Sequence, residues 1–154
     1  MRRMISLLIT ALPLLVIQPA ISEEQAKVAT PPASDYRQLI SMPEQARLLM
    51  QQDMLSHLST LNEILGYLAS NDLTAAAEVA EKNLGKSSMG KHRATGMGPG
   101  RYMTLEMRNI GWGMHDAASE FSNVAKQGNL KDAYSALNKV TGACVACHLS
   151  YRTR

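Results

Sequence analysis

Two cysteines and a histidine lie close together near the end of the sequence, in the order Cys144-Val145-Ala146-Cys147-His148. This C-x-x-C-H spacing is typical of c-type haem attachment. On a helix, two thiols three residues apart lie on one face, so both can form thioethers with vinyl groups on one edge of a porphyrin. Histidine is the common proximal ligand of haem iron, and the adjacent imidazole can take that place. The motif therefore predicts one covalently bound haem c, with His148 as an iron ligand.

Three other kinds of site can use the same residues. A thioredoxin-like dithiol needs a strand before the motif and βαβ surroundings. A zinc site needs four ligands, so both cysteines and His148 would have to be joined by one more histidine. A simple disulfide between Cys144 and Cys147 leaves His148 without a role.

The first 22 residues indicate export. Arg2 and Arg3 form a charged start, residues 4–17 are almost unbroken apolar sequence, and Ala20-Ile21-Ser22 offers a cleavage site, as in a secretory signal peptide. The apolar run is shorter than the ~20 residues that a transmembrane helix needs. We expect residues 1–22 to be removed and the mature chain to be periplasmic, with no membrane span. Covalent haem attachment also takes place outside the cytoplasm.

Composition narrows the class of the mature chain. Residues 23–154 contain 14 basic and 13 acidic residues, which argues against a nucleic-acid surface. Hydrophobic residues make up 45% of the 154-residue chain, but aromatic residues only 5%, so Leu, Ala and Met must fill the core. These residues are good helix formers. We find no nucleophile–base pair and expect no enzymatic activity.

Four amphipathic segments must position the motif. Apolar residues recur at steps of three and four within each segment, and no segment alternates with a period of two. The expected helices run from a Ser41/Glu44 capping box to about Ala69, from Leu73 after an Asp72 cap to Leu84, from near Tyr102 to Gly128, and from near Asn129 through Tyr151. Residues 23–40 read as a flexible lead-in. The glycine-rich segment 85–100 reads as a plain connection, with His92 exposed. The prediction is an all-α antiparallel up-down-up-down four-helix bundle over residues 41–154, without a sheet.

A C-x-x-C-H motif in the last helix of an exported four-helix chain resembles the class II c-type cytochromes, which are cytochrome c prime and its low-spin relatives. Tyr151-Arg152 adds to the resemblance, because that family commonly continues C-x-x-C-H-x-x-Tyr/Phe-Arg. The resemblance covers residues 41–154, but only its C-terminal motif is specific. It implies haem held by Cys144 and Cys147, proximal His148, and Arg152 close to the haem edge. It also implies that homodimers are possible.

The second axial ligand should come from the first turns of the first helix. In such a bundle this part of the chain lies beside the end of the fourth helix. The candidates are Met50, Gln51, Met54 and His57. Met54 begins the inward-facing stripe, and methionine is a known partner of histidine at haem iron. Counting from an Arg one turn earlier, as the family often has, favours Gln51 instead. We favour Met54, and ordinary core packing is its alternative role.

The distal residue decides the function. A protein ligand at the sixth position gives low-spin iron and predicts a one-electron carrier that docks with periplasmic redox partner proteins. An apolar side chain there leaves the iron five-coordinate and open to NO or CO, as in cytochrome c prime. A third possibility is an exported helical protein that binds a metal or carries a thiol function without haem.

Overall fold

The computed structural model describes residues 35–154, and this part of the chain is mainly helical. Its helices are α1 (Glu44–Ala69), α2 (Leu73–Asn83), α3 (Leu105–Ala125) and α4 (Leu130–Ser150). The predicted helical class is confirmed. The predicted signal peptide and residues 23–34 of the lead-in lie outside the described residues. No helix in the described part is long and apolar enough to span a bilayer.

Local signals account for most helix ends. The Asp72 carboxylate accepts a 2.9 Å hydrogen bond from the Ala75 N–H, and Asn129 accepts bonds from two N–H groups at the start of α4. Gly128 has a φ of +82°, which is accessible to glycine without strain, and separates α3 from α4. These three predicted boundaries are confirmed.

The predicted starts of α1 and α3 are wrong. Residue Pro43 precedes α1 and makes no side-chain cap, so the Ser41/Glu44 capping box does not form. Proline fixes its own φ, and this already favours entry into a helix without such a box. Helix α3 begins three residues after Tyr102, where the Thr104 side chain accepts a bond from the Met107 N–H.

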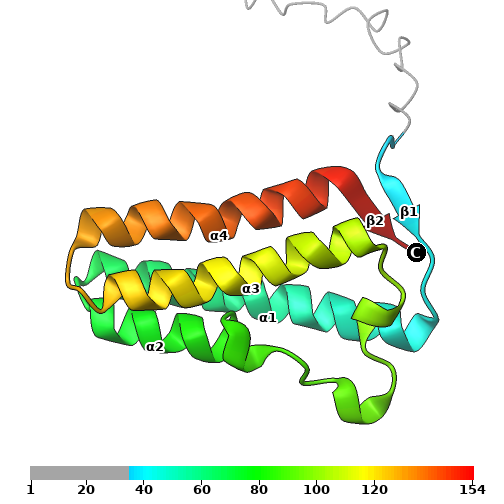
Figure 1. Cartoon of the computed structure of the whole chain (residues 1–154), viewed down its shortest axis with the longest axis horizontal. Helices are drawn as coiled ribbons and strands as arrows, with labels where there is room; N and C mark the ends of the chain where they lie inside the picture. The colour runs from blue at the N-terminus through cyan, green and yellow to red at the C-terminus, as the bar shows by residue number, and fades with distance from the viewer. Residues whose placement is uncertain (1–34) are drawn as a thin grey trace, which may run out of the picture. The chain divides into compact units, whose positions relative to one another are not determined.

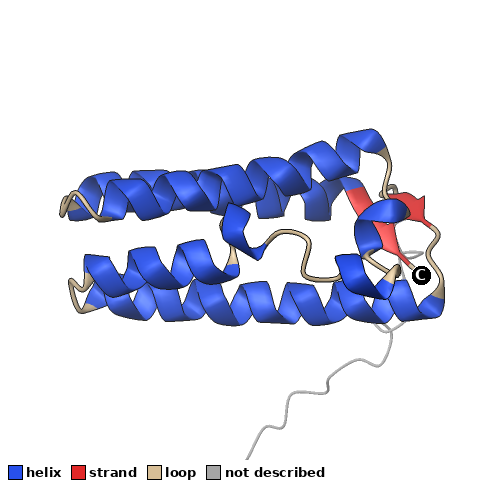
Figure 2. Ribbon diagram, turned by 60° about the horizontal axis from the view of Figure 1, so that its bottom comes forward, coloured by secondary structure: helices blue, strands red, loops and turns tan. Residues whose placement is uncertain are grey.

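Consecutive helices pack against each other. Helix α1 packs on α2, α2 on α3 and α3 on α4, whereas α1 and α4 make few direct contacts. Figures 1 and 2 show the four helices side by side. The main core lies between them and contains Phe121, Ile64 and Leu68, which are almost completely buried. Many alanines fill the rest of this core, as the shortage of aromatic residues required.

A short parallel pair of strands joins the two ends of the described chain. Strand β1 (Gln38–Ile40) pairs with β2 (Tyr151–Thr153), and Gln38 lies opposite Tyr151. The prediction that the chain has no sheet is therefore wrong. Three-residue strands are too short to give a detectable periodicity. Part of the segment that we expected to be a flexible lead-in thus forms β1, whose Ile40 is buried.

Ile40 belongs to a second, smaller core at the end of the molecule where β1 and β2 lie. This core also contains Met42, Ala46, Met50 and Met107, and Cys147 and Tyr151 pack against it. The C-x-x-C-H motif is therefore anchored by apolar contacts with the start of α1, the start of α3 and β1.

Candidate cofactor site

The predicted site residues from both ends of the sequence line one cavity of about 800 Å³. Helix α4 and β2 contribute Cys144, Cys147, His148 and Arg152, and α1 contributes Met50, Gln51, Met54 and His57. Helix α3 adds Met107, Ile110 and Met114. The structure thus brings together every residue that the sequence analysis assigned to a haem site. The cavity lies where α1 and α4 make few direct contacts.

Both cysteines are free thiols near the C-terminal end of α4. The Cys144 thiol donates a 3.4 Å hydrogen bond to the Val140 carbonyl, one turn earlier. Burial raises the pKa of both thiols, and the nearby Cys144 raises that of Cys147 further. Both thiols are therefore protonated at neutral pH. The motif lies within a helix, and the short strand β2 follows it, so it lacks the preceding strand of a thioredoxin-like site.

His148 lies in the last turns of α4, and its side chain is exposed. A contact across the cavity end fixes its backbone, because an Arg37 Nη1 group donates a 3.5 Å hydrogen bond to the His148 carbonyl. The Arg152 Nε group in turn donates to the Arg37 carbonyl at 3.3 Å. Together with the β1–β2 pairing, these bonds hold the end of the motif and the residues that follow it. The imidazole itself remains accessible from the cavity.

The wall formed by α1 presents the four candidate distal ligands differently. Met50 is buried in the second core, and Gln51 is exposed. Met54 is half-buried, lines the cavity and belongs to neither apolar core. Its thioether can therefore bind a cofactor in the cavity without giving up contacts in either core. This geometry favours Met54 over Met50.

His57 is a neutral imidazole at neutral pH. Its pKa is lowered from 6.5 to about 4, mainly by burial and then by the nearby Lys91 and His115, against an opposing effect of Asp53. A neutral imidazole has an unprotonated nitrogen that can bind a metal. His57 also lines a second cavity, together with residues of α3 and of the segment between α2 and α3. It is thus an alternative to Met54 as the distal residue.

The walls of the large cavity are mainly apolar, and some of them face solvent. The Leu55 and Leu58 side chains, on the same part of α1 as Met54, are 70% and 65% exposed. Exposed leucines grouped at the mouth of an apolar cavity indicate a surface that a partner or ligand covers. The volume of the cavity is also within the usual range of about 300–1,000 Å³ for cofactor sites. The cavity therefore fits a flat, largely apolar group such as haem.

Several lining residues were not predicted from the sequence. Arg37 precedes the first helix and has no local pattern that places it beside His148. Leu58 belongs to the apolar stripe predicted for the first helix, and Leu55 does not; such a stripe does not distinguish a cavity wall from a packed core. Ile110 could have been recognised only from the position of α3 relative to α4.

The described residues include no group of three or more His, Cys, Asp or Glu side chains placed to hold a metal ion. Comparison with known proteins gives no match to a protein-family model, to a curated protein or to a solved structure.

Proposed function

We propose that this chain is a periplasmic monohaem c-type cytochrome that carries single electrons, with its haem in the large cavity. One observation supports this most strongly: both thiols of the C-x-x-C-H motif, the adjacent His148 and the candidate ligand Met54 line the same apolar cavity. The resemblance of the motif to the class II c-type cytochromes supports it independently. In this proposal the four helices form an antiparallel up-down-up-down bundle around the cofactor.

The chemistry needs little from the protein beyond attachment, ligation and exclusion of water. When bound, the haem supplies an iron centre that is reduced and oxidised by one electron. Cys144 and Cys147 would tether it through thioethers, and His148 and Met54 would supply the axial donors. Leu55 and Leu58 would exclude water from one side, and Ile110 from another. A rigid, dry site changes little between the two oxidation states, which suits electron transfer.

Mass and absorption spectra of the full-length chain, produced in a bacterial host that matures c-type haem, test this proposal. We expect the intact mass to exceed that of the processed polypeptide by one haem. The Cys144→Ala/Cys147→Ala variant should lack this added mass. A Val145→Ala variant, which changes an exposed residue between the cysteines, should retain it. A bare polypeptide from the unmodified sequence would refute the proposal and leave the non-haem alternative.

The same sample separates the two haem functions. Sharp α and β bands on reduction indicate low-spin iron with a protein ligand at the sixth position, as an electron carrier requires. Broad, displaced bands that change when CO is added indicate five-coordinate iron. That result would replace the carrier by a gas-binding protein, with Met54 in a packing role.

A further inference from the structure

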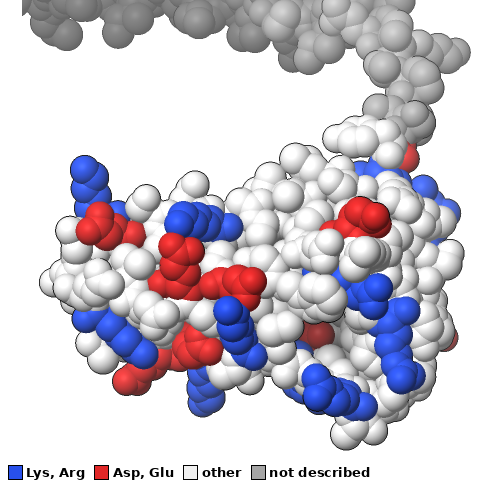
Figure 3. Space-filling model, viewed as in Figure 1, with Lys and Arg blue, Asp and Glu red and all other residues white. Residues whose placement is uncertain are grey.

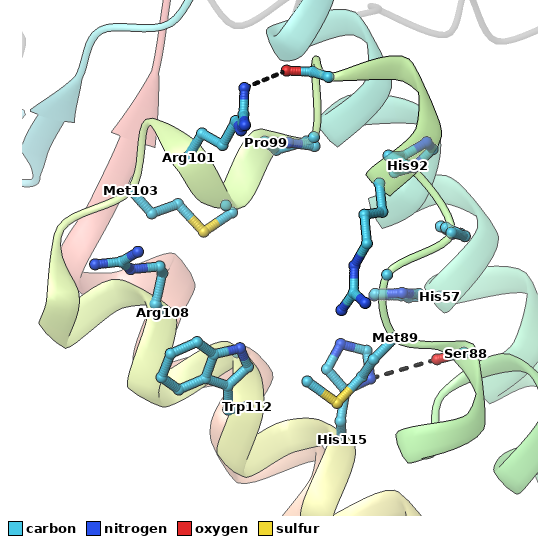
Figure 4. A pocket seen from close by; sticks show the side chains of 17 residues that line it. His57, Ser88, Met89, His92, Pro99, Arg101, Met103, Arg108, Trp112 and His115 are labelled. Carbon is cyan, nitrogen blue, oxygen red and sulfur yellow. Dashed lines mark hydrogen bonds between the residues drawn. The ribbon is translucent and has the colours of Figure 1, made fainter.

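A second cavity, of about 440 Å³, lies between α1, α3 and the segment that connects α2 to α3. The connection contains three short 3₁₀ helices, at Lys86–Ser88, Arg93–Thr95 and Pro99–Arg101. Figure 4 shows side chains from this connection, from α1 and from α3 around one opening. The segment is therefore more than the plain connection that the sequence analysis predicted.

The connection is fixed to the helices at both sides of the opening. The Lys86 N–H donates a 2.9 Å hydrogen bond to the Ser119 hydroxyl of α3. His92 lies 3.0 Å from both carboxylate oxygens of Asp53 on α1, so the prediction that it is solvent-exposed is wrong. Its side chain is only 20% exposed. The His115 ring and the Leu84 carbonyl are 2.7 Å apart, which ties α3 to the end of α2.

The lining of this second cavity is strongly basic. It includes Lys91, Arg93, Arg101 and Arg108, and it includes no Asp or Glu. Asp53, which lies outside the lining, is 2.7 Å from Lys91 and neutralises that charge. The three arginines have no carboxylate within ion-pairing distance in the described part of the chain. Figure 3 shows basic side chains gathered over the connection, at the lower right of the molecule.

Arg108 lines this cavity and has an unsatisfied hydrogen-bond donor. Its Nε atom is buried and has no hydrogen-bond partner. A buried guanidinium nitrogen without an acceptor is unfavourable, and native proteins rarely leave such a group unsatisfied. Because the protein covers this Nε atom, the Arg108 side chain must turn toward the cavity before an anionic oxygen there can supply the acceptor. Guanidinium groups bind carboxylates and phosphates particularly well.

Part of the remaining wall of this cavity is apolar. Met89, Pro99, Met103 and Trp112 border the opening (Figure 4). Trp112 is 47% exposed, and the guanidinium carbon of Arg108 lies 6.0 Å from the centre of its ring. The sequence contains no other tryptophan. An arginine-lined wall beside an exposed aromatic ring can bind a ligand that carries an acidic group on a compact apolar body.

We propose that this second cavity binds a small organic anion. The acidic group, a carboxylate or a phosphate, contacts Arg108 together with Arg93 and Arg101. The apolar body packs on Trp112. The proposal uses no property of the haem cavity, although His57 and Gly111 line both.

Isothermal titration of the full-length protein tests this proposal with four probes. Phenyl phosphate and benzoate carry both parts of the ligand, inorganic phosphate carries only the acidic group, and benzyl alcohol only the apolar body. We expect one molecule of phenyl phosphate to bind, at least about tenfold more tightly than inorganic phosphate or benzyl alcohol. No saturation by phenyl phosphate or benzoate up to about 1 mM would overturn the proposal.

Variants then locate the binding. Arg108→Gln should weaken phenyl phosphate binding about tenfold, because it removes a charge-assisted hydrogen bond. Arg93→Gln changes an exposed side chain, leaves the fold intact and should act in the same direction. Lys131→Gln, at the far end of α4, makes the same change in net charge and should leave the affinity unchanged. Equal weakening by Lys131→Gln and Arg93→Gln would show a general charge effect and refute the assigned site.

Trp112→Leu tests the position of the apolar body. It should weaken phenyl phosphate binding and leave inorganic phosphate binding unchanged. Equal affinity of this variant and the unmodified protein for phenyl phosphate would refute packing on Trp112. Because the titrations can be repeated on the Cys144→Ala/Cys147→Ala variant, their outcome does not depend on whether haem is attached.

Discussion

Replacing Leu58 by Ala should affect stability only when the haem cavity is filled. Leu58 is 65% exposed, so its truncation in the haem-free chain should change the free energy of unfolding by less than about 0.5 kcal/mol. If haem covers this side chain, the truncation removes roughly three buried methylene equivalents at about 0.8 kcal/mol each. Scaling by the 65% that becomes covered gives a loss of about 1.5 kcal/mol in the haem-loaded protein.

Denaturant unfolding followed by helical circular dichroism measures this difference. The comparison uses Leu58→Ala in the haem-loaded protein and in the haem-free Cys144→Ala/Cys147→Ala background. Leu48→Ala is the matched control, because Leu48 lies on α1, is 51% exposed and does not line the cavity. Its effect should be the same in both backgrounds. An equal loss for Leu58→Ala with and without haem would refute the assignment of the haem to this wall.

Three further outcomes follow from the same structure. Met54→Ala should convert low-spin iron to high-spin iron and lower the reduction potential, since Met ligation raises it; an unchanged spectrum would assign Met54 to packing. Burial first, and then Lys91 and His115, lower the pKa of His57 from 6.5 to about 4. Between pH 6.5 and about pH 4, the unfolded state therefore binds a proton at His57 that the folded state does not bind. The free energy of unfolding should therefore fall as the pH decreases from 6.5 to about 4, and His57→Gln should flatten this dependence in denaturant titrations. Asp72→Ala removes the cap of α2 and should lower the free energy of unfolding by about 1 kcal/mol, which thermal unfolding would detect; no change would show that the 2.9 Å bond to Ala75 contributes nothing.

The helices could be predicted because their signals are local. Apolar residues at steps of three and four marked each helix, and Asp72 and Asn129 have side chains suited to caps. The short strands β1 and β2 had no such signal, because each is stabilised by a partner at the opposite end of the described chain. The start of α1 was misplaced because Ser41 and Glu44 matched a capping pattern that the chain does not use.

The site was predictable to the extent that its chemistry is encoded in one short motif. Cys144, Cys147 and His148 are adjacent in sequence, whereas the opposite wall depends on how α1 packs. The periodicity correctly placed Met54 and its neighbours toward the motif, but it could not show that Leu55 and Leu58 stay exposed. The basic cavity was missed altogether, because its residues come from three elements and its glycine-rich segment has no period.

The pairing of β1 with β2 also bears on the order in which the molecule assembles. The hydrogen bond from Arg152 to Arg37 joins residues 115 positions apart. Closing so long a loop costs more entropy than one hydrogen bond offsets, so the chain between the two residues must be largely ordered first. Contacts between neighbouring helices involve much shorter loops and form sooner. We therefore expect the end of α4 and β2 to pair with β1 last during folding. During that interval both thiols remain reachable in a helical domain that has otherwise assembled.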